Sequence, residues 1–305
     1  MNVGRASPRL WAAFWNHPIS LLIVTTLMWA GHAVVGRMAV GQISPMFLTS
    51  ARWAIALALI LFAARKDLPR DWPILRGRLP YIGAMGALGY TAFNALFYIA
   101  AHFTGALNMA ILQGAMPAMV LIGAWAVFGA RIGALQALGV AATMIGVVAI
   151  AAQGEWSRLF RLQFNFGDLI MLVAVVFYSG YTVALRFRPA VSSLGFLAAM
   201  AVAAFLSSLP LAAVEFARGE FKPPSWTGIF VLAYATVIAS FLSQLFFMRG
   251  VELIGPGRAG VFINLVPVFG AVMAVALLGE KFGGYHIIAL ILVVGGIAAA
   301  QKAPK

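Results

Sequence analysis

An apolar run begins at Ile19, ends at Ala39 and reads ISLLIVTTLMWAGHAVVGRMA. At about 1.5 Å of rise per residue, a helix of this length crosses the hydrocarbon core of a bilayer. Arg5 and Arg9 precede the run, but it lacks the short apolar segment and small-residue cleavage site of a secretory signal. We therefore expect a retained first transmembrane helix.

The rest of the chain repeats this pattern, with short gaps that hold most of the proline, glycine and charged residues. Together the runs cover residues 19–39, 45–64, 80–101, 106–128, 132–152, 167–186, 193–214, 226–248, 258–279 and 285–301. Each is close to the ~20 residues that a spanning helix needs, whereas strands of a membrane barrel have about ten residues and alternate in polarity. The pattern predicts an all-α integral membrane protein with ten transmembrane helices.

The composition points the same way, because 63% of the residues are hydrophobic and only 10% are charged, against about 25% charged in soluble domains. The net charge is +13, but no basic stretch is interleaved with aromatic residues, so we expect no nucleic-acid partner. With the N-terminus inside, about two thirds of the 21 Lys and Arg residues fall on the cytoplasmic side. We expect a bacterial inner-membrane protein with both termini, and the loop Arg65–Arg78, in the cytoplasm.

Catalytic and cofactor motifs are not evident in the sequence. The chain has no cysteine, and its four histidines and eight acidic residues are scattered without metal-ligand spacing. Residues 255–260 match the dinucleotide fingerprint GxGxxG, but that motif needs a βαβ unit and here it joins two apolar runs. We therefore expect no enzyme activity, no metal and no cofactor.

An internal repeat divides the chain into residues 1–152 and 153–305. At a spacing of 149 residues, Trp29 corresponds to Tyr178 and Arg37 to Arg186. At a spacing of 150 residues, Asn94 pairs with Gln244, Pro117 with Pro267, Gly129 with Gly279 and Gly146 with Gly296. Five spans in each repeat would make the second repeat enter the membrane from the opposite side. Inverted repeats are common in secondary transporters, which place the substrate site in a central cavity between the repeats.

These residues resemble two tandem EamA domains of the drug/metabolite transporter superfamily. The resemblance is carried by Trp29-Ala30-Gly31, Pro267, Gly279-Glu280 and Gly295-Gly296. Within the superfamily the chain is most similar to YddG-type amino-acid exporters of bacterial inner membranes. This implies export of amino acids, including aromatic ones and methionine, by alternating access. Ala130-Arg131 stands where the second half has Glu280-Lys281, so the resemblance transfers no function to Ala130.

Polar and aromatic side chains at membrane depth are the candidates for substrate binding, because such groups usually face a cavity or a partner. The expected binding residues are Trp29, His32, Asn94, Tyr98, Gln113, Tyr178, Tyr181, Gln244 and Asn264. The alternative for the amides is hydrogen bonding between neighbouring helices. His32 is either a proton carrier or a neutral histidine bonded to a neighbouring helix.

Three further residues have candidate roles in the membrane. Pro117 and Pro267 should each remove a backbone hydrogen bond and kink a span, as hinges or as static bends. Arg52 lies deeper in its run than Arg37 or Arg186, and could pair with a carboxylate or with substrate at the outer side.

A polar cavity without a fixed acidic charge suits a zwitterion with an apolar or aromatic side chain. We therefore expect a secondary exporter of amino acids that acts as a monomer in the lipid bilayer. An exporter of drugs or other small metabolites is the first alternative, and a membrane-embedded enzyme or a channel are the others. No acidic residue falls at mid-span, so we expect flux to follow the substrate gradient unless His32 carries protons.

Overall fold

The computed structural model describes residues 8–155, 165–254, 259 and 262–300, and within these ranges every regular element is a helix. The first half holds α1 (Pro8–Trp15), α2 (Pro18–Met38), α3 (Pro45–Ala63), α4 (Asp67–Leu75), α5 (Leu79–Met85), α6 (Phe93–Ala100), α7 (Ala106–Gln113), α8 (Met116–Phe128) and α9 (Ala134–Ala151). The second half holds α11 (Phe166–Ala184), α12 (Ser193–Ala217), α13 (Trp226–Ala233), α14 (Ser243–Ile254), α16 (Leu265–Leu278) and α17 (Gly284–Ala300). The 3₁₀ turns η1 (Arg76–Arg78) and η3 (Leu185–Phe187) and the π-helices η2 (Gly86–Ala92) and η4 (Tyr234–Leu242) complete the described elements.

Among the described residues, seven helical stretches are long and apolar enough to cross a membrane. They are Pro18–Met38, Pro45–Ala63, Asp67–Ala100, Ala106–Phe128, Phe166–Phe187, Ser193–Ala217 and Trp226–Ile254. Three shorter apolar helices follow the same pattern, namely Ala134–Ile150, Leu265–Leu278 and Gly284–Ala299. The predicted all-α class is thus confirmed over the described residues, and the count of ten spans stays a prediction.

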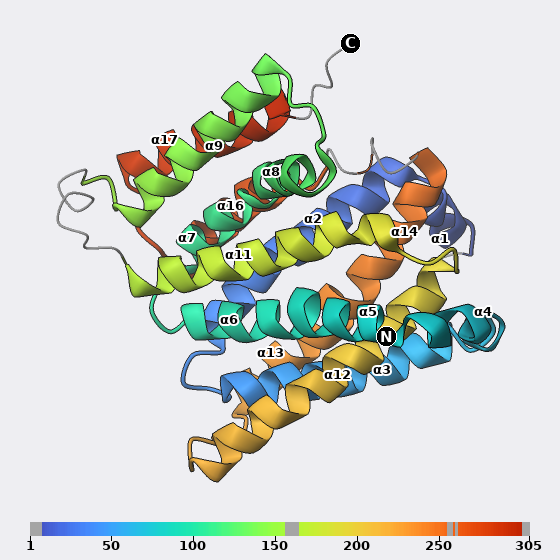
Figure 1. Cartoon of the computed structure of the whole chain (residues 1–305). Helices are drawn as coiled ribbons and strands as arrows, with labels where there is room; N and C mark the ends of the chain where they lie inside the picture. Colours follow the sequence, from blue (N-terminus) through green and yellow to red (C-terminus); the bar gives the residue numbers. More distant parts are fainter. Residues whose placement is uncertain (1–7, 156–164, 255–258, 260–261, 301–305) are drawn as a thin grey trace.

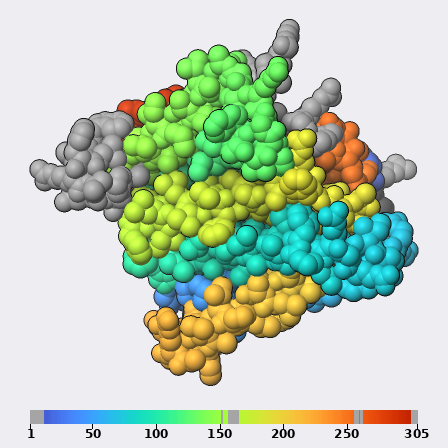
Figure 2. Space-filling view, in the orientation of Figure 1, coloured from blue at the N-terminus to red at the C-terminus, as the bar shows by residue number. Residues whose placement is uncertain are grey.

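The two halves of the chain interlock rather than fold side by side. Helix α9 packs on α17, α3 on α12, and α2 on both α14 and α16, so each of these pairs joins the two halves (Figure 1). Helix α11, yellow-green in the space-filling view, lies directly against the cyan segment that contains α6 and η2 (Figure 2). One cluster of buried residues therefore draws on both halves, including Phe97, Leu112, Met171 and Val293.

Repeat-matched glycines allow the closest of these contacts. A Cβ at Gly146 on α9 would meet the carbonyl oxygen of Ala289 on α17 at 2.9 Å. A Cβ at Gly296 would likewise collide with Thr143 and with the backbone of α9. Small residues that let helix backbones approach closely are typical of membrane helix packing. Gly146 on α9 and Gly296 on α17 therefore both allow the close packing of these two helices.

The segment expected to be a loop, Arg65–Arg78, is largely helical, because it contains α4 and η1. These elements continue into α5, η2 and α6, so that one helical stretch runs from Asp67 to Ala100. Asp67 lies in the first turn of α4, where a carboxylate favours the helix N-terminus. Asp71 is buried and accepts hydrogen bonds from the backbone and the hydroxyl of Ser192, which caps α12. This segment therefore ties the first half to the second at one end of the bundle.

Both prolines lie beside a helix break or a helix start, and their role as hinges stays a prediction. Helix α7 ends at Gln113 and α8 begins at Met116, so this span is already broken before Pro117. Pro117 lies in the first turn of α8 and Pro267 in the first turn of α16. The first N–H groups of a helix have no partner within it, so proline removes nothing there.

Candidate functional site

A buried arginine forms the centre of a polar cluster between the halves. Arg52 lies two turns inside α3, about 10 Å along its axis, and only 5% of its surface is exposed. Its Nε donates to Ser240 Oγ of η4 at 2.6 Å. Its Nη1 donates to Asn94 Oδ1 at 2.5 Å and to Tyr98 Oη at 2.9 Å, both on α6. The same nitrogen lies 2.8 Å from His32 Nε2 on α2.

All of these partners of Arg52 are neutral or can be neutral. Among the described residues no carboxylate lies within ion-pair distance of Arg52, since the ion pairs there are those of Arg70 and Arg249. Its second terminal nitrogen, Nη2, makes no hydrogen bond with them either. Burying a charge without a counter-charge is unfavourable in free energy, in protein and in membrane. The arrangement at Arg52 therefore points to a functional role.

The contacts of His32 bear on its role. Arg52 Nη1 has two N–H groups for three neighbours, Asn94, Tyr98 and His32. A guanidinium can only donate hydrogen bonds, so a bond from Nη1 to His32 Nε2 requires the lone pair of that nitrogen. The same nitrogen lies 3.0 Å from Tyr98 Oη, which can donate to it. The ring stacks on Phe97 at a centroid distance of 4.5 Å. Of the two roles considered for His32, this contact fits the neutral histidine bonded to neighbouring helices.

Aromatic rings extend from the cluster in a continuous row, here called the aromatic row. Successive centroids lie 4.5–5.9 Å apart. The row consists of His32, Phe97, Phe93, Tyr178, Tyr181, Tyr90 and Trp53. Its last ring, Trp53, lies 5.7 Å from the guanidinium carbon of Arg52, so the row begins and ends at the polar cluster. The site therefore combines hydrogen-bond donors with a large apolar surface.

Two buried polar atoms of the described residues have no hydrogen-bond partner, Trp53 Nε1 and Thr236 Oγ1. Trp53 follows Arg52 in the chain, and Thr236 precedes Ser240 by one turn of η4. Such unpaired groups are rare in native structures and call for an explanation. Thr236 lies on η4 and Tyr90 of the aromatic row on η2, the π-helices of the two halves, and π segments often occur at functional sites.

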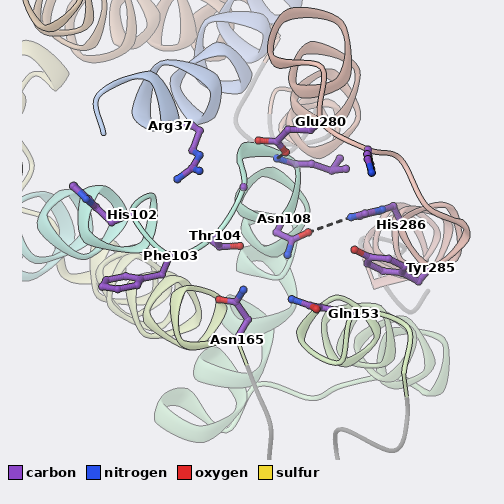
Figure 3. A pocket seen from close by; sticks show the side chains of 13 residues that line it. Arg37, His102, Phe103, Thr104, Asn108, Gln153, Asn165, Glu280, Tyr285 and His286 are labelled. Carbon is purple, nitrogen blue, oxygen red and sulfur yellow. Dashed lines mark hydrogen bonds between the residues drawn. The ribbon is translucent and has the colours of Figure 1, made fainter. Parts of the chain in front are cut away.

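A second polar site is a cavity of about 330 Å³ at the end of the bundle where α7 begins (Figure 3). Two of its lining residues, Thr104 and Asn108, donate hydrogen bonds to buried Asp168 at 2.5 and 3.2 Å. Asn108, at the centre of the view, is also bonded to His286 at 3.3 Å.

Basic groups and one carboxylate line the same cavity. Burial lowers the pKa of His102, between α6 and α7, and the positive charges of Arg37 and Lys222 lower it further. Glu280 accepts hydrogen bonds from the backbone N–H groups of Ala106 and Leu107 at 2.8 and 2.9 Å, and so caps α7.

Comparison with known proteins assigns the chain to a family. A model of the EamA-like transporter family matches residues 17–152 and again 165–300. The chain belongs to this family. The prediction of two EamA domains is thereby confirmed, and the chain is a multi-pass membrane protein of a transporter family.

Relatives of this EamA-like transporter bear transporter names. It is 27% identical to the "uncharacterized transporter YyaM" of Bacillus subtilis over 86% of each chain. It is 24% identical to an "uncharacterized transporter" of Archaeoglobus fulgidus over 91% of this chain and 94% of that protein. A solved crystal structure shares the fold with a TM-score of 0.60 at 18% identity, covering 92% of this chain and 95% of that one.

The structure gathers some of the residues expected to bind substrate and separates others. His32, Asn94 and Tyr98 meet at Arg52, and Tyr178 and Tyr181 lie in the aromatic row. The others, which are not partners of Arg52, are Trp29, Gln113, Gln244 and Asn264.

Each of these four has its own surroundings. Trp29 donates to Ser243 at 3.0 Å and packs on Phe247. Gln113 donates to Met109 O in its own helix at 3.2 Å. Gln244 is half-buried on α14, and buried Asn264 directly precedes α16.

Sequence reasoning placed Arg52 inside a span but did not include it among the binding residues. The signal was present, because an arginine two turns inside an apolar helix is costly without a function. Ser240, Thr236 and Trp53 gave no such signal, since small hydroxyls and tryptophan are common in membrane helices.

Proposed function

We propose that this EamA-like transporter is a secondary transporter that exports amino acids, aromatic and other apolar ones such as methionine, from the bacterial cytoplasm. The family supports transport. The substrate class is supported by one observation, the buried cluster at Arg52 bordered by the aromatic row. Hydrogen-bond donors suit the polar end of such a molecule, and the rings suit its side chain.

The proposed mechanism is alternating access between two inverted repeats, residues 1–152 and 153–305. The site draws on α2, α3 and α6 of the first repeat and on η4 and α11 of the second, as expected for a cavity between repeats. In this scheme the three shorter apolar helices also span the bilayer, and both termini lie in the cytoplasm of a monomer. The helix break before Pro117, and the start of α16 at Pro267, are the proposed hinges.

Counterflow in vesicles tests the proposal. Purified protein in proteoliposomes loaded with unlabelled phenylalanine should take up labelled phenylalanine or methionine, and uptake should saturate and require internal substrate. Liposomes without protein are the control. Competition only by drugs or other small metabolites would favour the alternative substrate class. Ionic conductance without saturation would identify a channel.

A further inference from the structure

We propose that Arg52 binds the carboxylate of the transported molecule, and that this carboxylate, not an amino group, is the obligatory feature of the substrate. The substrate class is then monocarboxylates with an aromatic or apolar side chain, with or without an amino group. This inference rests on the proposed function and makes it more specific.

The charge at the centre of the site is positive and uncompensated. Arg52 is buried, and its hydrogen-bond partners are the hydroxyls of Ser240 and Tyr98, the amide of Asn94 and the ring of His32. Neutral partners recover part of the desolvation cost of a buried ion but supply no opposite charge. A carboxylate ligand would supply that charge and would accept a hydrogen bond from the guanidinium.

The free hydrogen-bonding capacity of the site also favours an acceptor ligand. Nε and Nη1 of Arg52 are engaged, whereas Nη2 makes no hydrogen bond with the described residues. The two buried polar atoms without a partner among the described residues are Trp53 Nε1, on the residue adjacent in the chain, and Thr236 Oγ1 of η4. Nη2 and Trp53 Nε1 can only donate, whereas the Thr236 hydroxyl can donate or accept. An ammonium group is itself a donor, so it would find no partner in Nη2 or in Trp53 Nε1.

Carboxylates that could hold an ammonium group are engaged elsewhere. Asp71 and Glu215 accept backbone N–H groups at the starts of α12 and α3, and Glu280 does so at the start of α7. Asp168 is bonded to Thr104 and Asn108 at the second polar site. The hydrogen-bond acceptors around the Arg52 cluster are therefore neutral. They should give a ligand with an amino group little advantage in affinity over one without it.

The aromatic row completes the recognition of an apolar side chain. Tyr178 and Tyr181 lie at the half-buried part of the row, whereas Trp53, Tyr90 and Phe93 are buried. Rings of this kind bury an aromatic or aliphatic group without specifying a hydrogen-bond pattern. A single charged group beside an apolar aromatic surface predicts that the transporter requires a carboxylate on its substrate and accepts different apolar side chains.

Three ligands that share one side chain test the inference: phenylalanine, 3-phenylpropionate, which lacks the amino group, and phenylalaninamide, which lacks the carboxylate. We would measure competition in phenylalanine counterflow and, separately, thermal stabilisation of the purified protein. The acid should match phenylalanine within about threefold, and the amide should be weaker by roughly tenfold or more, as expected for loss of a charge-assisted contact. Equal potency of acid and amide in the unmodified protein would overturn the inference.

Variants localise the effect. Arg52→Gln should abolish the preference for acid over amide, and Arg52→Lys should keep the preference at lower affinity. Arg65→Gln removes the same charge just beyond the end of the same helix, at an exposed position, and should leave the preference intact. An acid preference that survives in folded Arg52→Gln would refute the assignment. If either Arg52 variant fails to fold, the comparison of the three ligands on the unmodified protein still tests whether the carboxylate is required.

The two readouts separate this inference from the proposed function. Stabilisation by 3-phenylpropionate that is lost in Arg52→Gln supports the carboxylate site even where no amino-acid flux is seen. Saturable phenylalanine flux with an equally potent amide supports the function and refutes the carboxylate site.

Discussion

Glu280→Gln should destabilise the protein more than any exposed carboxylate substitution. Glu280 follows α16, and its two carboxylate oxygens each accept one backbone N–H at the start of α7, from Ala106 at 2.8 Å and Leu107 at 2.9 Å. These N–H groups lack partners within α7, and the negative charge is favoured at a helix N-terminus. The side chain therefore fastens the second half of the chain to the first.

The magnitude follows from this geometry. Hydrogen bonds to charged groups contribute about 1.5–3 kcal/mol each. Glutamine keeps one acceptor, turns an NH₂ toward the other N–H and removes the charge, so we expect a loss of roughly 2 kcal/mol. At about 2–4 °C per kcal/mol for a large domain, the unfolding temperature should fall by roughly 4–8 °C.

The assay is thermal unfolding of the purified protein in detergent, with Glu252→Gln as the matched control. Glu252 is exposed on α14 and forms a surface ion pair with Arg249 at 3.2 Å, a contact that contributes at most about 1 kcal/mol. We expect the unfolding temperature of Glu280→Gln to lie well below that of Glu252→Gln. If the two variants unfold at the same temperature, the cap at α7 contributes nothing and the reasoning fails.

Three further predictions concern topology, hinges and energy coupling. The chain has no native cysteine, so a cysteine at Glu220 should react with an impermeant thiol reagent in intact cells and one at Arg70 should not; the reverse pattern would invert the orientation. Pro117→Ala should leave folded yield nearly unchanged, because this proline removes no helical hydrogen bond, yet should alter turnover in counterflow; unchanged turnover would mean a static break. His32→Gln keeps an acceptor for Arg52, so uptake should persist in it and should survive collapse of the proton gradient; accumulation driven by an imposed pH step, and lost in His32→Gln, would instead make His32 the proton carrier.

The fold was more predictable from the sequence than the site. Burial in a bilayer depends on the local run of apolar residues, so α2, α3 and α12 could be placed from the sequence alone. Arg52 could be placed inside a span for the same reason. Its partners could not, because His32, Asn94 and Ser240 come from three different elements whose approach depends on packing over the whole chain. The π-helices carry no residue signal, since they differ from α-helices only by a shift in hydrogen bonding.

Two residues that the repeat pairs differ in their surroundings. Asn94 and Gln244 correspond in the two halves, but Asn94 accepts a hydrogen bond from Arg52 and Gln244 is not a partner of that residue. That both line one cavity stays a prediction. The reason for the difference lies in the position that corresponds to Arg52 itself. In the second half this position falls at Ala201 or Val202 on α12, and neither can organise amides around a charge.

The two halves share a repeated sequence pattern but differ in where they carry charged residues. The first half supplies the buried cation, Arg52, and the second supplies the capping carboxylate, Glu280, where the first half has Ala130. Under the proposed inversion, the contact of Glu280 with α7 would have its counterpart at the opposite end of the bundle, where alanine offers no acceptor. A contact present at one end only biases the equilibrium between two states by its own free energy. At roughly 2 kcal/mol that is about a thirtyfold preference for the state that holds it. The unloaded transporter should then rest with α16 held against α7, and under the proposed carboxylate site the free energy of substrate binding at Arg52 would have to offset that preference before the end at α7 opens.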